Sequence, residues 1–440
     1  MTNTVNSREI ILDVLLSITR DGEFSHIILK QVLDKYSYLD KVERSFIKRV
    51  CQGTLENQIR IDYIINQVSS VPVKKMKSVI QTILRSGVYQ LEYMDQVPDS
   101  AACNEAVKLT KKRKFQNLSG FVNGVLRSVI RNRENIEFPD KEKNPEEFLS
   151  ITYSMPMWIV IQWVSDYGYS ITEEMLQSFL IPSTTSIRCN LNHMSVAKLK
   201  EKLEGEGVTV EENPDLPFAL QISKYDMLSH LPSFQEGDFY VQDVSSMRVA
   251  LAGDPKPGDL VIDVCAAPGG KSLHIAELLG TTGMVEARDL TENKIELIQH
   301  NIDRIGQKNI KAVLMDATIL DEDSVETADL LIADLPCSGL GVIGKKTDIK
   351  YNMSQEKIKE IVLLQRHILD VVSAYVKPGG TMIYSTCTIQ KSENQENVEW
   401  FLTKHDEFEL ITQEQIRPKS GSNDGFYIAK LKKRKNNEKN

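Results

Sequence analysis

Apolar residues recur at spacings of three and four through about the first 135 positions of the chain. This spacing puts them on one face of a helix, the pattern of amphipathic helices packed around a core. Pro72 and Pro98 fall between the periodic segments, where proline commonly ends or precedes helices. The expected helices lie at 8–18, 26–36, 43–68, 77–94, 103–112 and 118–132. Residues 1–135 are therefore predicted to form an all-α bundle.

The pattern changes after a polar, proline-containing linker at 132–148. Short apolar runs then alternate with amphipathic segments. The expected elements are helices at 155–168 and 195–207 and strands at 184–190, 208–213 and 218–223. A β-α-β arrangement in so few residues favours a small ferredoxin-like α+β domain at 150–235.

From residue 236 onward, apolar strand-like runs alternate regularly with helical patterns. The expected strands lie at 259–265, 283–289, 310–316, 328–334 and 381–388, with helices at 271–280, 293–306 and 354–380. This alternation predicts a Rossmann-like α/β domain at 236–432, with ligands bound at the carboxyl ends of its strands. The final segment, 430–440, is predicted to be a solvated tail.

Charge is distributed unevenly along the chain. The net charge is −8, but residues 1–135 hold 21 Lys and Arg against 14 Asp and Glu, a balance of +7 that leaves −15 for the rest. Such asymmetry hints at a nucleic-acid partner for the N-terminal region. A basic bundle that is merely solvated fits the same numbers equally well.

The bulk properties also bear on compartment and metal content. No apolar run approaches the roughly 20 residues that cross a bilayer, and the N-terminus lacks the basic segment of a signal peptide. We therefore expect a cytoplasmic protein without a membrane partner. The six cysteines include no C-x-x-C pair and no histidine cluster at zinc spacing, so neither a metal site nor a disulfide is expected.

The segment "DVCAAPGGKS" (263–272) reads as strand, tight glycine turn and helix. It ends like a nucleotide P-loop, but Cys265 occupies the position of the first glycine in that pattern. Gly269 and Gly270 still allow a ligand to approach the backbone and the helix N-terminus. The predicted cofactor contacts in this loop are Cys265, Ala266, Ala267, Pro268, Gly269, Gly270 and Lys271.

Carboxylates follow the next strands at the same edge of the predicted sheet. Asp289 lies where doubly wound folds bind ribose hydroxyls, Asp316 suits an adenine amino group, and Asp334 ends the fourth strand. With Asp263, these acids repel polyphosphate but accommodate a cation. The pattern therefore favours a sulfonium cofactor over NAD or ATP.

Together with the flanking motifs "FYVQDVSSM", "DLPCSGLG" and "YSTCT", this series resembles the S-adenosylmethionine-dependent RNA cytosine-C5 methyltransferases of the Fmu/RsmB (Sun) type. The basic helical region resembles the domain shared with the NusB antitermination factor. The resemblance covers nearly the whole chain. It implies S-adenosyl-L-methionine as cofactor and 16S rRNA, free or in an assembling small subunit, as substrate for a monomer. The alternatives are the same reaction on tRNA, or a non-catalytic RNA-binding assembly or antitermination factor.

The resemblance also assigns roles to two cysteines. Cys387 matches the family nucleophile that adds to C6 of the cytosine, and Cys337 matches the residue that assists proton removal and product release. Addition of a thiolate at C6 would turn C5 into an enamine carbon able to attack a methyl group. Lys345, Lys346 and Lys350, just past the Cys337 loop, are predicted to contact RNA phosphates.

Overall fold

The computed structural model describes residues 6–181, 184–419 and 423–435. The chain divides into two compact units. The first, here called the helical unit, comprises residues up to Leu180 together with Ile343–Asn352. The second, the sheet unit, comprises Ile181–Val342 and the residues from Met353 onward.

In the helical unit, the amphipathic helices between residues 7 and 131 pack around one apolar core, as the periodicity predicts. Its helices are α1 (Ser7–Thr19), α2 (Ser25–Lys35), α3 (Lys41–Glu56), α4 (Gln58–Val68), α5 (Ser78–Tyr93), α6 (Asp99–Lys112), α7 (Ser119–Arg131), α8 (Pro145–Thr152), α9 (Met157–Tyr167), α10 (Tyr169–Ser178) and α16 (Ile349–Asn352). One predicted helix, 43–68, is divided in two at Asn57. The Asn57 side chain donates to the Gly53 carbonyl oxygen at 3.0 Å, a local bond that competes with helix continuation.

Ile343–Asn352 packs within the helical unit although its sequence neighbours belong to the sheet unit. The Lys350 ammonium donates to the Glu56 carbonyl oxygen at 2.9 Å, and the Tyr351 hydroxyl donates to the Leu55 carbonyl oxygen at 2.7 Å. Burial lowers the pKa of Lys350 to about 7. The predicted phosphate contact is therefore wrong for Lys350, which is buried, whereas Lys345 and Lys346 are exposed.

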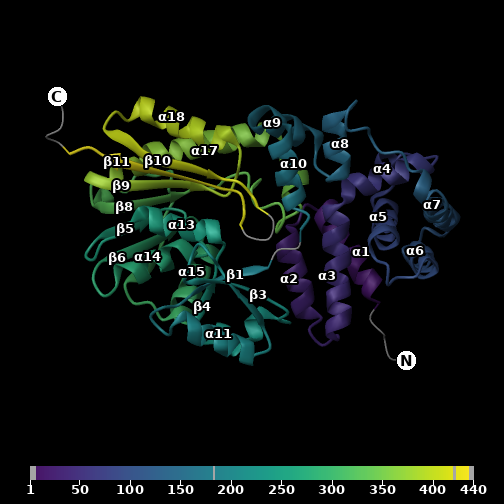
Figure 1. Cartoon of the computed structure of the whole chain (residues 1–440), viewed down its shortest axis with the longest axis horizontal. Helices are drawn as coiled ribbons and strands as arrows, with labels where there is room; N and C mark the ends of the chain where they lie inside the picture. Colours follow the sequence, from purple (N-terminus) through teal and green to yellow (C-terminus); the bar gives the residue numbers. More distant parts are fainter. Residues whose placement is uncertain (1–5, 182–183, 420–422, 436–440) are drawn as a thin grey trace. The chain divides into compact units, whose positions relative to one another are not determined.

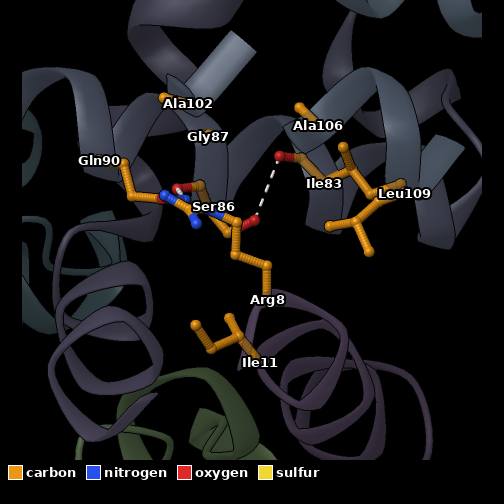
Figure 2. A pocket seen from close by; sticks show the side chains of 9 residues that line it. All are labelled: Arg8, Ile11, Ile83, Ser86, Gly87, Gln90, Ala102, Ala106 and Leu109. Atoms are coloured by element: carbon orange, nitrogen blue, oxygen red, sulfur yellow. Dashed lines mark hydrogen bonds between the residues drawn. The ribbon is translucent and has the colours of Figure 1, made fainter. Parts of the chain in front are cut away.

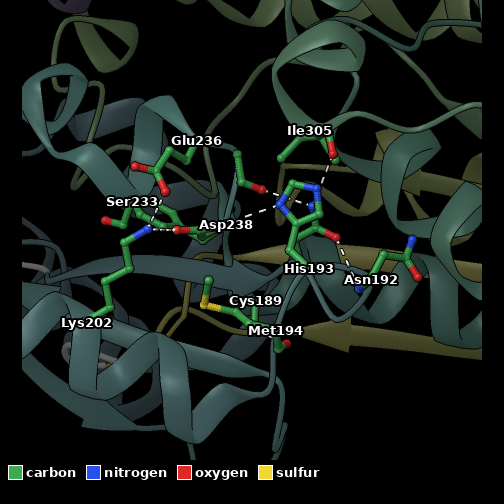
Figure 3. Close-up of polar contacts among 12 residues, drawn as sticks. Cys189, Asn192, His193, Met194, Lys202, Ser233, Glu236, Asp238 and Ile305 are labelled. Carbon is green, nitrogen blue, oxygen red and sulfur yellow. Dashed lines mark hydrogen bonds and ion pairs between the residues drawn. The ribbon is translucent and has the colours of Figure 1, made fainter.

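A four-stranded antiparallel sheet forms the first part of the sheet unit. It comprises β1 (Thr185–Cys189), β2 (Thr209–Glu212), β3 (Ala219–Ser223) and β4 (Phe239–Val241) in the order β2-β3-β1-β4, with α11 (Val196–Gly205) and α12 (Pro232–Gln235). Figure 3 shows the polar contacts at one end, where the Lys202 ammonium lies 2.6 Å from carboxylate oxygens of both Glu236 and Asp238. Strands β1 to β3 coincide with the predicted ones, whereas β4 was not predicted because it has only three residues.

A seven-stranded mixed sheet forms the second part. Its strands are β5 (Leu260–Asp263), β6 (Met284–Asp289), β7 (Ile310–Leu314), β8 (Ala328–Asp334), β9 (Val376–Thr386), β10 (Phe408–Ile416) and β11 (Phe426–Lys433). The order is β10-β11-β9-β8-β5-β6-β7, with β5 to β9 parallel and the last two strands antiparallel. Strand order reverses at β5, between β6 and β8, and the cleft outside the strand ends at such a point is the usual ligand site.

Helices cover both faces of this sheet. They are α13 (Val244–Gly253), α14 (Gly270–Leu279), α15 (Glu292–Ile305), α17 (Gln355–Val372) and α18 (Gln395–Lys404). Figure 1 shows α17 and α18 over one face and α13, α14 and α15 over the other. Alternate residues of β8 enter the two cores, Leu330 and Ile332 on one side and Leu331 and Ala333 on the other. Burial on both faces explains why its sequence is a continuous apolar run.

The C-terminal hairpin corrects one prediction. Residues 430–433, assigned to a solvated tail, form the end of β11, which pairs with β9. The buried residues Phe426, Tyr427, Ile428, Ala429 and Leu431 hold this strand in the sheet despite its lysines. Residues 436–440 of the predicted tail lie outside the described part of the chain. Among the described residues, no helix is long and apolar enough to cross a membrane.

Replacing Gly53 with alanine should destabilise the helical unit. A methyl group at this position in α3 would overlap the ring of Tyr89, which is fully buried and cannot move aside freely. We expect a loss of about 1–3 kcal/mol, the usual cost of overpacking a core.

Gly124→Ala is the matched control, because Gly124 is also inside a helix but has open space around it. That change should be neutral or stabilising by up to about 1 kcal/mol. Thermal unfolding followed by circular dichroism compares the two variants. Equal melting temperatures for the two would contradict the packing described for α3 and α5.

Candidate active site

The conformation of the loop after β5 depends on its glycines and on hydrogen bonds from residues outside the loop. Gly269 has φ +101°, a left-handed conformation that favours glycine, and α14 begins at the next residue. A methyl group on Gly270 would lie 2.8 Å from the ring of Tyr240. The Tyr240 hydroxyl donates to the Pro268 carbonyl oxygen at 3.0 Å, and the Asn301 amide donates to the same oxygen at 3.0 Å. The loop is therefore preorganised at the N-terminus of α14.

The acid that ends β5 has a structural environment. Asp263 is buried, and one of its carboxylate oxygens accepts a hydrogen bond from the Ser272 hydroxyl at 2.5 Å. Burial raises the pKa of Asp263 to about 7, although the hydrogen bond from Ser272 acts in the opposite direction. Asp263 thus connects the end of β5 to the first turn of α14 and stabilises the start of that helix. It does not belong with the acids that face the strand ends.

The other three acids lie at the carboxyl ends of successive parallel strands. Asp289 ends β6, and its carboxylate accepts the Ala267 amide of the loop at 2.9 Å and the Lys294 ammonium at 2.8 Å. Asp316 follows β7, and hydrogen bonds from Thr318 lower the pKa of its carboxyl. Asp334 ends β8 and is partly exposed. These three carboxylates fit a nucleoside, because they can accept hydrogen bonds from ribose hydroxyls and exocyclic amines.

Lys271 connects the loop to the end of β8. Its ammonium lies 2.7 Å from Asp334 Oδ2, and the Ser385 hydroxyl of β9 donates to Asp334 Oδ1 at 2.7 Å. Burial acts to lower the pKa of Lys271, but Asp334 and, more weakly, Cys387 raise it above its ordinary value. The ammonium also lies 5.3 Å from the ring centroid of Phe426. This cation is therefore charged and lies within electrostatic range of Cys387.

The two cysteines singled out from the sequence lie together. Cys337 Sγ and Cys387 Sγ are 3.2 Å apart, and neither residue forms a disulfide. The hydrogen bond with Cys387 and burial raise the pKa of Cys337 well above that of an ordinary thiol, and the charge of Glu393 adds to the effect. Burial also strongly raises the pKa of the third cysteine of this region, Cys265. Cys265 lies in the loop after β5 and, unlike Cys337 and Cys387, has no thiol partner.

Several residues of this region carried no signal in the sequence. Phe426 and Glu393 contact Lys271 and Ser338, respectively, but neither lies in a motif singled out from the sequence. Tyr240 and Ser338 lie inside such motifs, yet no role was predicted for either. Phe426 and Glu393 are distant in sequence from the residues they contact. Only the pairing of strands brings them there.

A cavity inside the helical unit is too small to compete as a ligand site. Figure 2 shows the residues that line it, and its volume is about 10 Å³, enough for about one water molecule. The Arg8 guanidinium beside it donates to Gln90 Oε1 at 2.9 Å, so this half-buried cation already has a partner.

Family models match three successive segments of the chain. The NusB family model covers residues 5–131, a ferredoxin-like domain of RsmF/B-like methyltransferases covers 155–227, and the 16S rRNA methyltransferase RsmB/F model covers 250–432. The predicted fold classes of the three segments are thereby confirmed. The predicted domain boundaries remain predictions.

Full-length relatives agree with these models. A probable ribosomal RNA small subunit methyltransferase B of Bacillus subtilis (strain 168) is 36% identical over 97% of this chain and 98% of its own. Ribosomal RNA small subunit methyltransferase B of Klebsiella pneumoniae (strain 342) is 29% identical over 99% of this chain and 100% of its own.

Solved structures extend the comparison to the fold. The crystal structure of PH0851 matches with a TM-score of 0.81 at 26% identity, covering 98% of this chain and 99% of that one. NSun6 from Pyrococcus horikoshii with SFG matches with a TM-score of 0.57 at 25% identity, covering 62% of this chain and 97% of that one. The chain therefore belongs to the 16S rRNA methyltransferase RsmB/F family, whose members depend on S-adenosylmethionine.

Proposed function

We propose that this methyltransferase modifies C5 of a cytosine in 16S rRNA through a covalent bond between Cys387 and C6 of the base. The observation that carries the proposal is the pair of thiols, 3.2 Å apart and not joined in a disulfide, beside the ion pair of Lys271 and Asp334. Methylation of an oxygen or an exocyclic nitrogen requires no thiol nucleophile. C5 of cytosine, in contrast, is a poor nucleophile until C6 has been attacked.

The surroundings of the two thiols support different roles for them. The positive charge of Lys271 lies within electrostatic range of Cys387 and favours its thiolate. The hydrogen bond with Cys387, burial and the Glu393 charge keep Cys337 protonated in the resting enzyme. Cys387 is therefore the nucleophile, and Cys337 begins the reaction as a thiol.

Formation of the covalent bond changes the state of Cys337. Once the Cys387 sulfur is bonded to C6, it no longer carries a negative charge or shares a proton with its neighbour. The largest cause of the raised pKa of Cys337 then disappears, so this thiol can lose its proton and act as a base. Cys337 would take the proton from C5 after methylation, and the electrons of that C–H bond would re-form the C5–C6 double bond as the Cys387 sulfur leaves.

Cofactor binding is assigned to the loop and the strand-end acids. Cys265, Ala266, Ala267, Pro268, Gly269, Gly270 and Lys271 would line the site with Asp289, Asp316 and Asp334. S-adenosylmethionine bound there supplies an electrophilic methyl group. Because Lys271 is already paired with Asp334, we assign it a second task, which is to hold positive charge near Cys387.

The substrate assignment rests on family membership and on charge. The region 1–135 carries a balance of +7, and Lys345 and Lys346 are exposed in the same helical unit. Basic surfaces of this kind bind the RNA backbone and do not themselves read sequence. Action in the cytoplasm as a monomer, on free rRNA or on an assembling particle, remains the prediction made from the sequence.

Replacing Cys387 with serine should abolish turnover without loss of cofactor binding. A serine hydroxyl is a far weaker nucleophile at neutral pH, so we expect kcat to fall at least about 1000-fold. Radiolabelled methyl transfer to RNA measures the activity, and calorimetry measures S-adenosylmethionine affinity. Cys103→Ala, a buried cysteine of α6, is the control and should retain activity. Full activity in Cys387→Ser would refute the covalent mechanism.

Replacing Cys337 with serine should trap the enzyme on its substrate. The methylated base would then lack the thiol that removes the C5 proton, so the bond between Cys387 and C6 should persist. We expect a protein–RNA complex that survives denaturing electrophoresis, dependent on added S-adenosylmethionine. The double variant Cys337→Ser/Cys387→Ser should form none. A complex that persists in the double variant would show that another residue is the nucleophile.

A further inference from the structure

Glu393 is a buried carboxylate to which the proposed reaction assigns no contact with the substrate or the cofactor. It ends the short 3-10 helix Lys391–Glu393, just after the Cys387 segment, and its exposed fraction is 0%. Burial raises the pKa of its carboxyl, and hydrogen bonds from Ser338, Gln365 and Thr388 oppose that rise. A buried carboxylate is costly to desolvate, and such groups are often no more stabilising than well-packed apolar residues. Its presence beneath the cysteine segments therefore calls for a role besides stability.

The carboxylate of Glu393 accepts two hydrogen bonds from Ser338, the residue that follows Cys337. The Ser338 amide donates to Glu393 Oε2 at 2.8 Å, and the Ser338 hydroxyl donates to Glu393 Oε1 at 2.5 Å. Both carboxylate oxygens are thus directed at one residue, which restrains its position and its orientation. Gln365 of α17 donates to Glu393 Oε2 at 3.2 Å and to the Pro336 carbonyl oxygen at 2.9 Å, on the other side of Cys337.

The same contacts reach the residue next to Cys387. The hydroxyl oxygens of Ser338 and Thr388 are 2.9 Å apart. Ser338 follows Cys337 directly and Thr388 follows Cys387 directly, so one chain of hydrogen bonds joins the two thiol-bearing segments. The Gly341 amide also donates to the Cys387 carbonyl oxygen at 3.1 Å, which ties the loops once more through their backbones.

Glu393 is itself fixed to the sheet. The Tyr384 hydroxyl of β9 donates to the Glu393 carbonyl oxygen, and Asn397 of α18 donates to the Tyr384 oxygen at 3.2 Å. Tyr384, Asn397 and Gln365 are all buried. A fully satisfied buried network has few alternative arrangements. Glu393 therefore fixes the positions of the Cys337 and Cys387 segments relative to the sheet.

We propose that Glu393 is a positioning residue that sets the separation of the Cys337 and Cys387 thiols by holding Ser338 against Thr388. The inference rests on the proposed two-cysteine reaction. It predicts that loss of the carboxylate leaves substrate and cofactor binding intact but lowers the rate of the chemical steps, because a thiol displaced by about 1 Å can cost 100-fold in rate.

Steady-state methylation by the full-length enzyme provides the first test. Glu393→Gln should lower kcat about 10- to 100-fold and leave the KM values for RNA and S-adenosylmethionine within about twofold. Glu396→Gln removes the same charge from an exposed position of α18 and should behave as wild type. A kcat loss that merely follows the unfolded fraction, measured by circular dichroism at the assay temperature, would reduce Glu393 to a structural residue and overturn the proposal.

Thiol proximity provides a test that needs no methyl transfer. Phenylarsine oxide condenses with two adjacent thiols to form two As–S bonds and releases one water molecule, with no change in oxidation state. Its affinity for the Cys337–Cys387 pair, measured by mass spectrometry of the intact protein, should fall at least about fivefold in Glu393→Gln as the effective concentration of one thiol at the other falls. Unchanged affinity would overturn the proposal even if kcat falls.

A double-mutant cycle tests the route of the effect. If Glu393 acts through Ser338, then Ser338→Ala/Glu393→Gln should be no slower than Glu393→Gln alone. Fully additive losses would overturn that route. Ser338→Ala also serves as the second variant should Glu393→Gln fail to fold, with the same expected loss of kcat and arsenical affinity. Full activity of Cys387→Ser would instead refute the proposed reaction, while the arsenical measurements would still report on the position of the thiols.

Discussion

The parallel pairing of β8 with β9 determines the geometry of the site. Asp334 lies opposite Ser385 in this ladder, and each strand then enters a loop that carries a cysteine two or three residues later. A slip of one residue would turn every side chain of the strand to the opposite face. Burial of β8 on both faces opposes such a slip, because alternate residues of the strand enter two separate cores. The distance between the Cys337 and Cys387 thiols is therefore a consequence of core packing.

The loop between β5 and α14 is joined to the same strand ends by a short chain of polar contacts. Lys271 pairs with Asp334, Asp334 accepts the Ser385 hydroxyl, and Ser385 lies two residues before Cys387. A change in the loop can thus alter the electrostatic surroundings of Cys387 through one ion pair. The result is an asymmetry between two chemically identical thiols, with positive charge near Cys387 and the negative charge of Glu393 near Cys337.

Sequence reasoning succeeded where a residue's environment is set by its own segment. Long apolar runs predicted the parallel strands, and helical periodicity predicted the bundle, because burial on one or two faces leaves a direct mark on the pattern. The family resemblance singled out Cys337 and Cys387, and the structure brings their sulfur atoms within 3.2 Å of each other. The short β4, β10 and the lysine-rich β11 were missed, since their pairing depends on neighbours that the local pattern does not reveal. The predicted helix 354–380 was too long, because α17 ends at Val372 and β9 begins at Val376.

Residues whose role depends on distant partners could not be predicted. Lys350 looks like a surface cation in its own segment, yet the helical unit buries it against the Glu56 carbonyl. Asp263 resembles the other strand-end acids until its hydrogen bond from Ser272 of α14 distinguishes it. Glu393 is one acid in a polar stretch, and only its contact with Ser338, 55 positions away, gives it significance.

The most direct test of the account maps the methyl group on RNA. Total RNA from cells that lack this gene would be incubated with the enzyme and S-adenosylmethionine and then read by bisulfite sequencing, in which 5-methylcytosine resists deamination. The account predicts protection at a single cytosine of 16S rRNA, with no protection when Cys387→Ser replaces the wild type. Protection confined to tRNA would contradict the substrate assignment, and methyl incorporation without any protected cytosine would contradict the C5 chemistry.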